Sequence, residues 1–247
     1  MQQEKNRWLL DTWIGANDVD INGIAKQSVL LRHVEEGIFM QHETFGPSIE
    51  SLRADKDMGF ILSKVAARID EPIRAGSHIH VETWAAEPKG FTFMRYARIT
   101  CMEKVVAEYA LTWALVRLSE RTLVRGGTGG EIELGFGFMP AIDVGVSLRA
   151  RFPKDAEIES TAKHVTSYSE ADENGHMNNT FYPDLLCGVS DMRGKRIAEY
   201  TLSYLKEAPI GVGFEISAAC RDGLLYVTTA LDSGENGATA CFRLVSV

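Results

Sequence analysis

The sequence predicts an α+β protein in which one structural unit, a long helix wrapped by a curved antiparallel sheet, is used twice. Three observations support this prediction. The same order of elements occurs in both halves of the 247-residue chain, short motifs recur in the same order, and a glycine-rich segment separates the halves. Because two such units can pair edge to edge, we expect an intramolecular pseudo-dimer in which each unit protects one sheet edge of the other.

The first unit is predicted to occupy residues 1–125. Its helix is expected over residues 24–46, where Val29, Val34 and Ile38 recur at helical spacing. Runs rich in β-branched and aromatic residues, bounded by Gly, Pro and charged turns, predict the strands. These strands are expected at residues 7–14, 59–69, 78–86, 92–102 and 105–119.

Residues 126–160 are predicted to be a linker. The run Gly-Gly-Thr-Gly-Gly at residues 126–130 disfavours a helix or strand, because glycine loses much backbone entropy when it is ordered. The second unit is predicted over residues 161–247, with its helix at 178–194. Its strands are expected at residues 162–169, 197–206, 214–221, 224–232 and 238–246.

The most informative repeated motif precedes each helix. The pattern Asp-x-Asn-Gly occurs at residues 20–23 and again at 172–175, and it is followed by Ile24 in the first unit and by His176 in the second. Two further patterns repeat in the same order: Pro-Ile-x-x-Gly at 72–76 and 209–213, and Ala-x-x-Arg-Leu at 114–118 and 240–244. Since the first unit lacks the histidine, we expect it to carry no chemistry.

Composition and charge restrict the class of protein. The formal net charge is −8 at pH 7 and is spread evenly, which argues against nucleic acid or an anionic membrane surface as the main partner. No run approaches the ~20 apolar residues that span a bilayer. The four cysteines have no CxxC spacing, so no metal site is predicted. We expect a cytoplasmic protein.

The run from Asp172 through Asn174 and His176 to Asn179 reads Asp-x-Asn-x-His-Met-Asn-Asn. Together with the tandem layout, it resembles the hot-dog thioesterases and, more narrowly, the acyl–acyl-carrier-protein (acyl-ACP) thioesterase family. The resemblance extends from about residue 5 to 247, and the stretch Tyr-Thr-Leu-Ser-Tyr-Leu-Lys-Glu at 200–207 narrows it. It implies two tandem hot-dog domains that hydrolyse fatty acyl-ACP, ending fatty-acid synthesis, without a cofactor.

The resemblance also places the acidic residue Glu207 in the catalytic set. Many plant relatives carry a cysteine directly after this glutamate, whereas here that residue is Ala208. We therefore expect water, rather than a cysteine thiolate, to attack the thioester.

The four predicted catalytic residues suit hydrolysis by water. Glu207 or Asp172 can act as base, and spacing does not decide between them. His176 can pass a proton because its reference pKa of ~6.5 lies near neutral pH. The amide of Asn174 can hold water or a carbonyl oxygen at any pH. Asp172 and Asn174 can equally shape a turn.

The start of the second helix is expected to contact the substrate through Asn178 and Asn179, because the first N–H groups of a helix lack intrahelical partners and can stabilise an oxyanion. Asn178 is equally suited to capping that helix. The resemblance implies that the first unit forms the acyl-chain pocket. Its candidate lining residues, each also a candidate for ordinary core, are Val29, Val34, Met40, Met58, Phe60 and Trp84.

Arg193, Lys195 and Arg196 form the clearest basic cluster of the second unit. Because carrier protein is acidic, this cluster is a candidate docking site. The alternative is a solvated helix end that complements the helix dipole.

Three other functions compete with hydrolysis of acyl-ACP. The nearest is an acyl-CoA thioesterase with the same site. A double-hot-dog dehydratase would need a His-x-x-x-Gly pattern, which is not found. A non-catalytic acyl-binding protein would not need His176 and Glu207. Pairing of two chains into a homodimer stays open.

Overall fold

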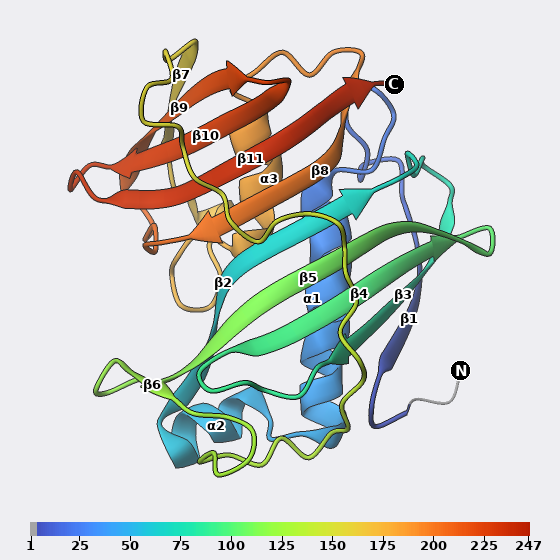
Figure 1. Ribbon diagram of the computed structural model, residues 1–247, viewed down its shortest axis with the longest axis vertical. Coiled ribbons are helices and arrows are strands. Elements are labelled where there is room, and N and C mark those ends of the chain that lie inside the picture. Colours follow the sequence, from blue (N-terminus) through green and yellow to red (C-terminus); the bar gives the residue numbers. More distant parts are fainter. Residues whose placement is uncertain (1–3) are drawn as a thin grey trace.

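The computed structural model describes residues 4–247 and contains one antiparallel sheet of eleven strands (Figure 1). Read from each edge towards the centre, the strand order is β1-β3-β4-β5-β2 on one side and β7-β9-β10-β11-β8 on the other. The two halves of the sheet therefore repeat one strand order, and β6 pairs with β5 outside this pattern. The strands are β1 (Trp8–Trp13), β2 (Met58–Ile69), β3 (His78–Ala85), β4 (Phe93–Cys101), β5 (Lys104–Arg117), β6 (Thr122–Val124), β7 (Ser160–Val165), β8 (Lys195–Tyr204), β9 (Gly213–Arg221), β10 (Leu224–Leu231) and β11 (Asn236–Ser246).

The halves of the sheet join through β2 and β8. These strands pair antiparallel, in a register that runs from Lys64 opposite Ser203 to Arg68 opposite Glu199. Each half thus covers an inner edge of the other, which leaves β1 and β7 as the outer edges.

The helices lie on one face of the sheet (Figure 1). The long helix α1 (Gln27–Phe45) begins three residues later than predicted, and a second helix that the sequence pattern did not predict, α2 (Ile49–Lys56), follows it. The hydroxyl oxygen of Ser48 caps α2 by accepting from the N–H of Ser51.

The prediction of a helix over residues 178–194 is wrong in length, because the observed helix is much shorter. The structure has a 3-10 turn at Asn179–Phe181 and a short helix, α3 (Tyr182–Cys187). Pro183 is tolerated there because it lies in the first turn, where its missing N–H costs nothing. The helix ends at Gly188, a residue type with very low helix propensity.

Two hydrogen bonds between the halves cap α1. Lys26, at the N-cap position, provides no side-chain cap. The carboxylate of Asp184 in α3 takes this role, with Oδ1 accepting from the N–H of Gln27 and Oδ2 from the N–H of Ser28, both at 2.9 Å. The halves also share one hydrophobic core, to which α1 contributes Leu31.

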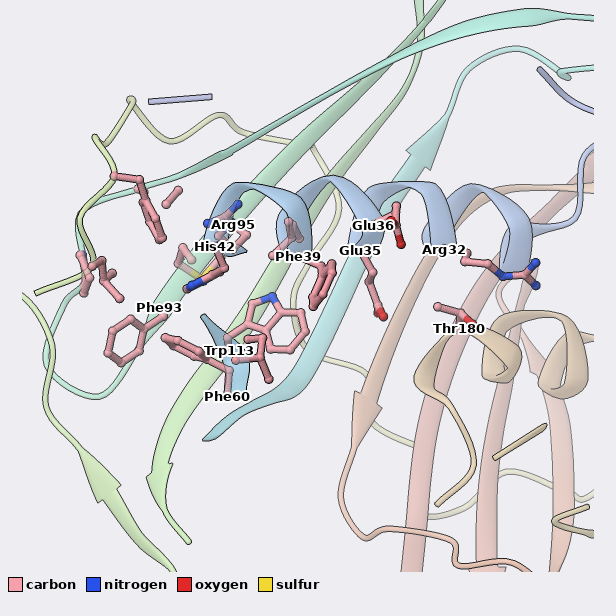
Figure 2. A pocket seen from close by; sticks show the side chains of 18 of the residues that line it. Arg32, Glu35, Glu36, Phe39, His42, Phe60, Phe93, Arg95, Trp113 and Thr180 are labelled. Atoms are coloured by element: carbon pink, nitrogen blue, oxygen red, sulfur yellow. The ribbon is translucent and has the colours of Figure 1, made fainter. Parts of the chain in front are cut away.

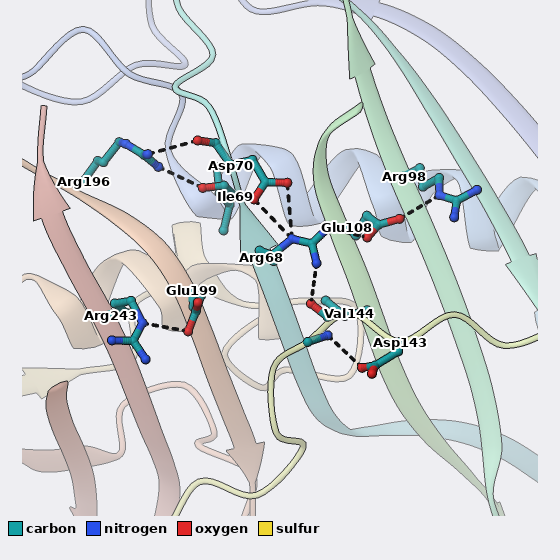
Figure 3. Close-up of polar contacts among 11 residues, drawn as sticks. Arg68, Ile69, Asp70, Arg98, Glu108, Asp143, Val144, Arg196, Glu199 and Arg243 are labelled. Carbon is teal, nitrogen blue, oxygen red and sulfur yellow. Dashed lines mark hydrogen bonds and ion pairs between the residues drawn. The ribbon is translucent and has the colours of Figure 1, made fainter. Parts of the chain in front are cut away.

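The segment between β6 and β7 contains no helix or strand. Its part from Met139 to Leu148 packs on the face of the sheet opposite the helices (Figure 1), whereas Leu134 and Phe136 lie on the helix side. The indole N–H of Trp84 donates to the carbonyl of Pro140 at 3.0 Å, and the hydroxyl of Thr239 donates to the carbonyl of Ala150. Figure 3 shows the guanidinium of Arg68 reaching the carbonyl of Val144 in this segment. This face of the sheet is therefore partly covered by the chain itself.

None of the helices within residues 4–247 combines the length and the apolar character that a bilayer crossing requires.

Candidate active site

The loop that precedes α3 is organised by the carboxylate of Asp172. Its Oδ1 accepts from the backbone N–H of Asn174 at 2.8 Å and of His176 at 3.2 Å. The carbonyl of Ala208 accepts from the N–H of Met177 at 2.9 Å, which ties this loop to the segment after β8. The loop and the Glu207 segment are therefore held side by side by backbone hydrogen bonds.

This arrangement brings two of the predicted catalytic residues together. The Nε2 atom of His176 lies 3.6 Å from Oε2 of Glu207, and the two side chains are 29% and 63% exposed. The separation exceeds a good hydrogen bond, but it is within the range that a bound reactant tightens. Ala208, which follows the glutamate, is buried and carries no reactive group.

The first unit repeats the turn without the chemistry. Oδ1 of Asp20 accepts from the N–H groups of Asn22 at 2.8 Å and of Ile24 at 3.1 Å, as Asp172 does in the second unit. Ile24, at the position of the histidine, is 5% exposed and belongs to the core. The shared aspartate therefore shapes both turns.

The two asparagines of the repeated motif contact different partners. The amide of Asn22 donates to the carbonyls of Met192 and Lys195, which fixes the turn before β8. The amide oxygen of Asn174 instead accepts from the guanidinium of Arg53 at 3.0 Å, and its nitrogen makes only a 3.4 Å contact with Asp172. The Asn174 N–H groups are thus more available to a substrate than those of Asn22.

A cavity of about 300 Å³ runs along α1 (Figure 2). One end contains Arg32 and Thr180, to which Asn178 is hydrogen-bonded, and the other contains His42 and Arg95. Its wall is mainly apolar and aromatic. The remaining lining residues are Glu35, Glu36, Ile38, Phe39, Ile49, Phe60, Ala85, Ala86, Pro88, Phe93, Met94, Trp113, Leu134 and Phe136.

The predicted pocket residues are only partly in this wall. Phe60 lines it, and Asn178 lies at its end near the second unit. The other candidates do not line the cavity: Val29 and Val34 belong to the shared core, Met58 packs in the cluster beneath α2, and Met40 is half-buried on α1.

Trp84, which was predicted to line the acyl-chain pocket, lies elsewhere in the structure. Strand β3 alternates its side chains between the two faces of the sheet, and Trp84 points to the face covered by the segment after β6, where it stacks on Tyr96. It therefore lies on the opposite side of the sheet from the cavity.

The predicted oxyanion donors at the start of the second helix are also fewer than expected. The N–H of Thr180 already donates to the side-chain oxygen of Asn178 at 2.9 Å, so Asn178 acts as a cap. The carbonyl of Asn179 accepts from the hydroxyl of Tyr204 at 2.8 Å. These contacts fix the backbone next to His176 and leave Asn179 as the remaining candidate donor.

The two helix starts differ in what faces them. Asp184 of the second unit covers the first N–H groups of α1. The repeated motif aligns Asp172 with Asp20, which lies 152 positions earlier. The same offset aligns Asp184 with Arg32. Arg32 is exposed and lines the cavity beside Thr180. The second helix start therefore opens to the cavity, whereas the first is sealed.

Glu35 is a site residue that the sequence did not reveal, because a glutamate beside Glu36 on a helix is usually solvated. Figure 2 shows its carboxylate in the cavity, and its Oε1 is buried without a partner among residues 4–247. Burial raises the pKa of Glu35 to about 8, and the negative charge of Asp172 adds to this shift. Glu35 is therefore mostly protonated at pH 7.

The basic cluster of the second unit lies beside Asn22 rather than beside His176. Arg193 forms an ion pair with Asp191 at 2.7 Å. Arg196 donates to the backbone carbonyls at the end of β2, as Figure 3 shows. Lys195 begins β8, and its carbonyl accepts from the Asn22 amide. Much of the cluster thus serves contacts within the protein.

The fold matches that of solved acyl-ACP thioesterase structures over almost the whole chain. An acyl-ACP thioesterase from Bacteroides thetaiotaomicron has a TM-score of 0.81 with this chain at 19% identity, covering 99% of this chain and 100% of that one. A 12:0-ACP thioesterase from Umbellularia californica has a TM-score of 0.80 at 12% identity, covering 98% of each chain. The predicted α+β fold is confirmed.

Residues 11–126 match the model of the acyl-ACP thioesterase N-terminal domain. This match confirms the predicted resemblance to the acyl-ACP thioesterase family within residues 11–126. None of the curated proteins matches the sequence.

Proposed function

We propose that this protein hydrolyses fatty acyl-ACP to free fatty acid and carrier protein at a site built on His176 and Glu207. The observation that carries the proposal is the 3.6 Å approach of these two side chains. His176 lies two residues before Asn178, which lines the wall of an apolar cavity. A fatty acyl chain needs such a cavity, and a thioester needs a base and a polar site at its end.

In the proposed reaction, Glu207 and His176 together remove a proton from water while its oxygen bonds to the thioester carbonyl carbon. The carbonyl oxygen becomes an oxyanion, which the Asn174 amide and the Asn179 N–H stabilise in this proposal. Collapse of this intermediate breaks the carbon–sulfur bond. The thiolate then receives the proton held by the His176–Glu207 pair, so the products are a carboxylic acid and a thiol.

Asp172 has a supporting role in this proposal. Its Oδ1 is committed to two backbone N–H groups, whereas Glu207 is the carboxylate that faces His176. Asp172 therefore holds the loop, and Glu207 serves as the base or as the partner that orients His176.

The carrier preference requires a direct comparison. The experiment measures kcat/KM for the same acyl group on ACP and on CoA, with wild-type protein, His176→Ala and the first-unit control Asp20→Asn. We expect higher kcat/KM with ACP, loss of both activities in His176→Ala and near-wild-type rates in the control. Equal rates for His176→Ala and wild type would refute the site, and a preference for CoA would refute the proposed carrier.

A further inference from the structure

The end of the cavity that contains His42 and Arg95, here called the inner end, holds a buried cation. Arg95, on the inner face of β4, is 4% exposed and lines the cavity. Its Nη2 donates to Oε1 of Gln41 at 2.5 Å, and its guanidinium lies 5.2 Å from the ring centre of Phe136. No carboxylate among residues 4–247 pairs with it in an ion pair, although a buried arginine ordinarily has one.

Several polar atoms at this end have no partner. Nε and Nη1 of Arg95 are buried and make no hydrogen bond within residues 4–247. The same is true of Nδ1 of His42, which is 5% exposed, and of the indole nitrogen of Trp113. Figure 2 shows Arg95 and His42 adjacent at this end of the cavity, away from Arg32 and Thr180.

The environment favours a neutral His42 beside a charged Arg95. Burial and the neighbouring positive charge of Arg95 lower the pKa of His42 to about 3. At neutral pH the imidazole is therefore uncharged, with one N–H donor and one acceptor. The end of the cavity thus combines a fixed positive charge with neutral polar groups, inside an otherwise aromatic wall.

A role in the fold accounts for only part of this arrangement. Gln41 links Arg95 to the N-terminal segment, because its Nε2 donates to the carbonyl of Lys5 at 3.1 Å. That link uses one guanidinium nitrogen of three. A methyl end of an acyl chain would leave the other two desolvated and unpaired, which is unfavourable. A group with acceptor oxygens would satisfy them.

We propose that the inner end of the cavity binds an oxygen-bearing distal end of the acyl chain, a hydroxyl or a carboxylate far from the thioester. This inference rests on the proposed function, which puts the thioester at the opposite end of the cavity, beside Thr180. Arg95 is the residue that recognises the oxygen, and His42 and Trp113 are neighbouring polar groups of the same subsite.

The test compares matched substrates in one protein. A saturated acyl group and its ω-hydroxy and ω-carboxy derivatives are loaded on the same carrier at each of several chain lengths, and kcat/KM is measured for each. We expect one oxygenated derivative to exceed the plain acyl group by about tenfold or more, since hydrogen bonds to charged groups are among the stronger ones. Which derivative is faster tells whether the subsite prefers a hydroxyl or a carboxylate.

Arg95→Met should abolish this preference, whereas Arg98→Met is the matched control. Arg98 lies on the same strand but faces the other side of the sheet, where it pairs with Glu108. The ratio of two kcat/KM values in one variant does not depend on its folded fraction. A wild-type preference for the plain chain, or an unchanged ratio in Arg95→Met, would overturn the inference.

If Arg95→Met does not fold, a binding measurement on the wild-type protein still tests the inference. Calorimetry with wild-type protein compares a free fatty acid with its ω-hydroxy and ω-carboxy derivatives and needs no hydrolysis. Tighter binding of an oxygenated acid supports the subsite, and equal or weaker binding overturns it. Failure to hydrolyse any acyl thioester would instead refute the proposed function, so the two failures are distinguishable.

Discussion

At the scale of single residues, hydrogen bonding separates two carboxylates of similar sequence context. One carboxylate oxygen of Asp172 accepts hydrogen bonds from two backbone N–H groups. Asp20 accepts the equivalent two bonds in the unit that lacks the histidine. Glu207 is exposed and faces His176. The duplicated turn is thus an internal comparison that distinguishes a role in geometry from a role in chemistry.

The first prediction separates these roles by isosteric substitution. Asp172→Asn keeps an acceptor oxygen for both backbone bonds, so kcat should fall by less than about tenfold, whereas Glu207→Gln removes the proposed base and should lower kcat by about 10² to 10⁴. Steady-state kinetics with one acyl-ACP measures both. A larger loss in Asp172→Asn than in Glu207→Gln would reverse the assignment.

The second prediction concerns the stability contributed by Glu35. Its pKa in the folded protein is about 8, against an ordinary value of 4.5, so the folded state holds a proton that the unfolded state releases between these pH values. The free energy of unfolding should therefore fall as pH rises from 4.5 to 8, by at most about 1.4 kcal/mol per pH unit from this group.

Glu35→Gln should lack this contribution. Urea unfolding at pH 5 and pH 8 should show that the variant gains stability relative to wild type as pH rises, because its neutral amide never ionises. Titration of all other groups affects both proteins alike and cancels in the comparison. A constant difference between the two proteins across this range would show that Glu35 titrates normally.

At the scale of elements, the cap on α1 comes from the other half of the chain. The third prediction is that Asp184→Ala lowers the free energy of unfolding by about 1–2 kcal/mol, as expected for loss of an N-cap. Chemical denaturation measures this change. Glu157→Ala, at an exposed position, is the control and should change stability by no more than about 0.5 kcal/mol. Equal effects would mean that the cap contributes nothing.

The order of the strands along the chain and the position of the candidate catalytic loop could be predicted from the sequence because they depend on repeated local patterns. Turn residues recur with fixed offsets, and they bound runs of β-branched and aromatic residues. The length of the second helix could not be predicted as well. Pro183 is compatible with either a helix start or a break, and the apolar residues that follow it do not distinguish the two.

The wall of the cavity was harder to predict, for a reason that lies in β3 and β4. The segment after β6 covers the outer face of these strands, so both of their faces carry large apolar side chains, such as Phe93 inside and Tyr96 outside. Alternation then no longer tells the inner face from the outer. The sequence pattern therefore does not show that Trp84 lies on the outer face, and nothing in it marks Arg95 as a residue of the inner face.

At the scale of the whole molecule, we expect the position of positive charge around the cavity to decide where the proposed carrier protein docks. The fourth prediction is that Arg32→Glu lowers turnover of acyl-ACP more than turnover of a short acyl thioester, because Arg32 is exposed beside the cavity end that contains Thr180. Reversing Arg193, Lys195 and Arg196 together should have a smaller effect on acyl-ACP. Kinetics with both substrates measures this, and the opposite order would assign docking to that cluster.

The pair of opposite charges at one repeated position, Asp184 in one unit and Arg32 in the other, has a consequence for stoichiometry. Two identical units would offer two equivalent grooves, and occupation of one could influence the other. Here Asp184 closes one helix start while the groove beside Arg32 stays open. A single chain should thus bind one acyl group, and its saturation curve should be hyperbolic, with no cooperativity between its halves.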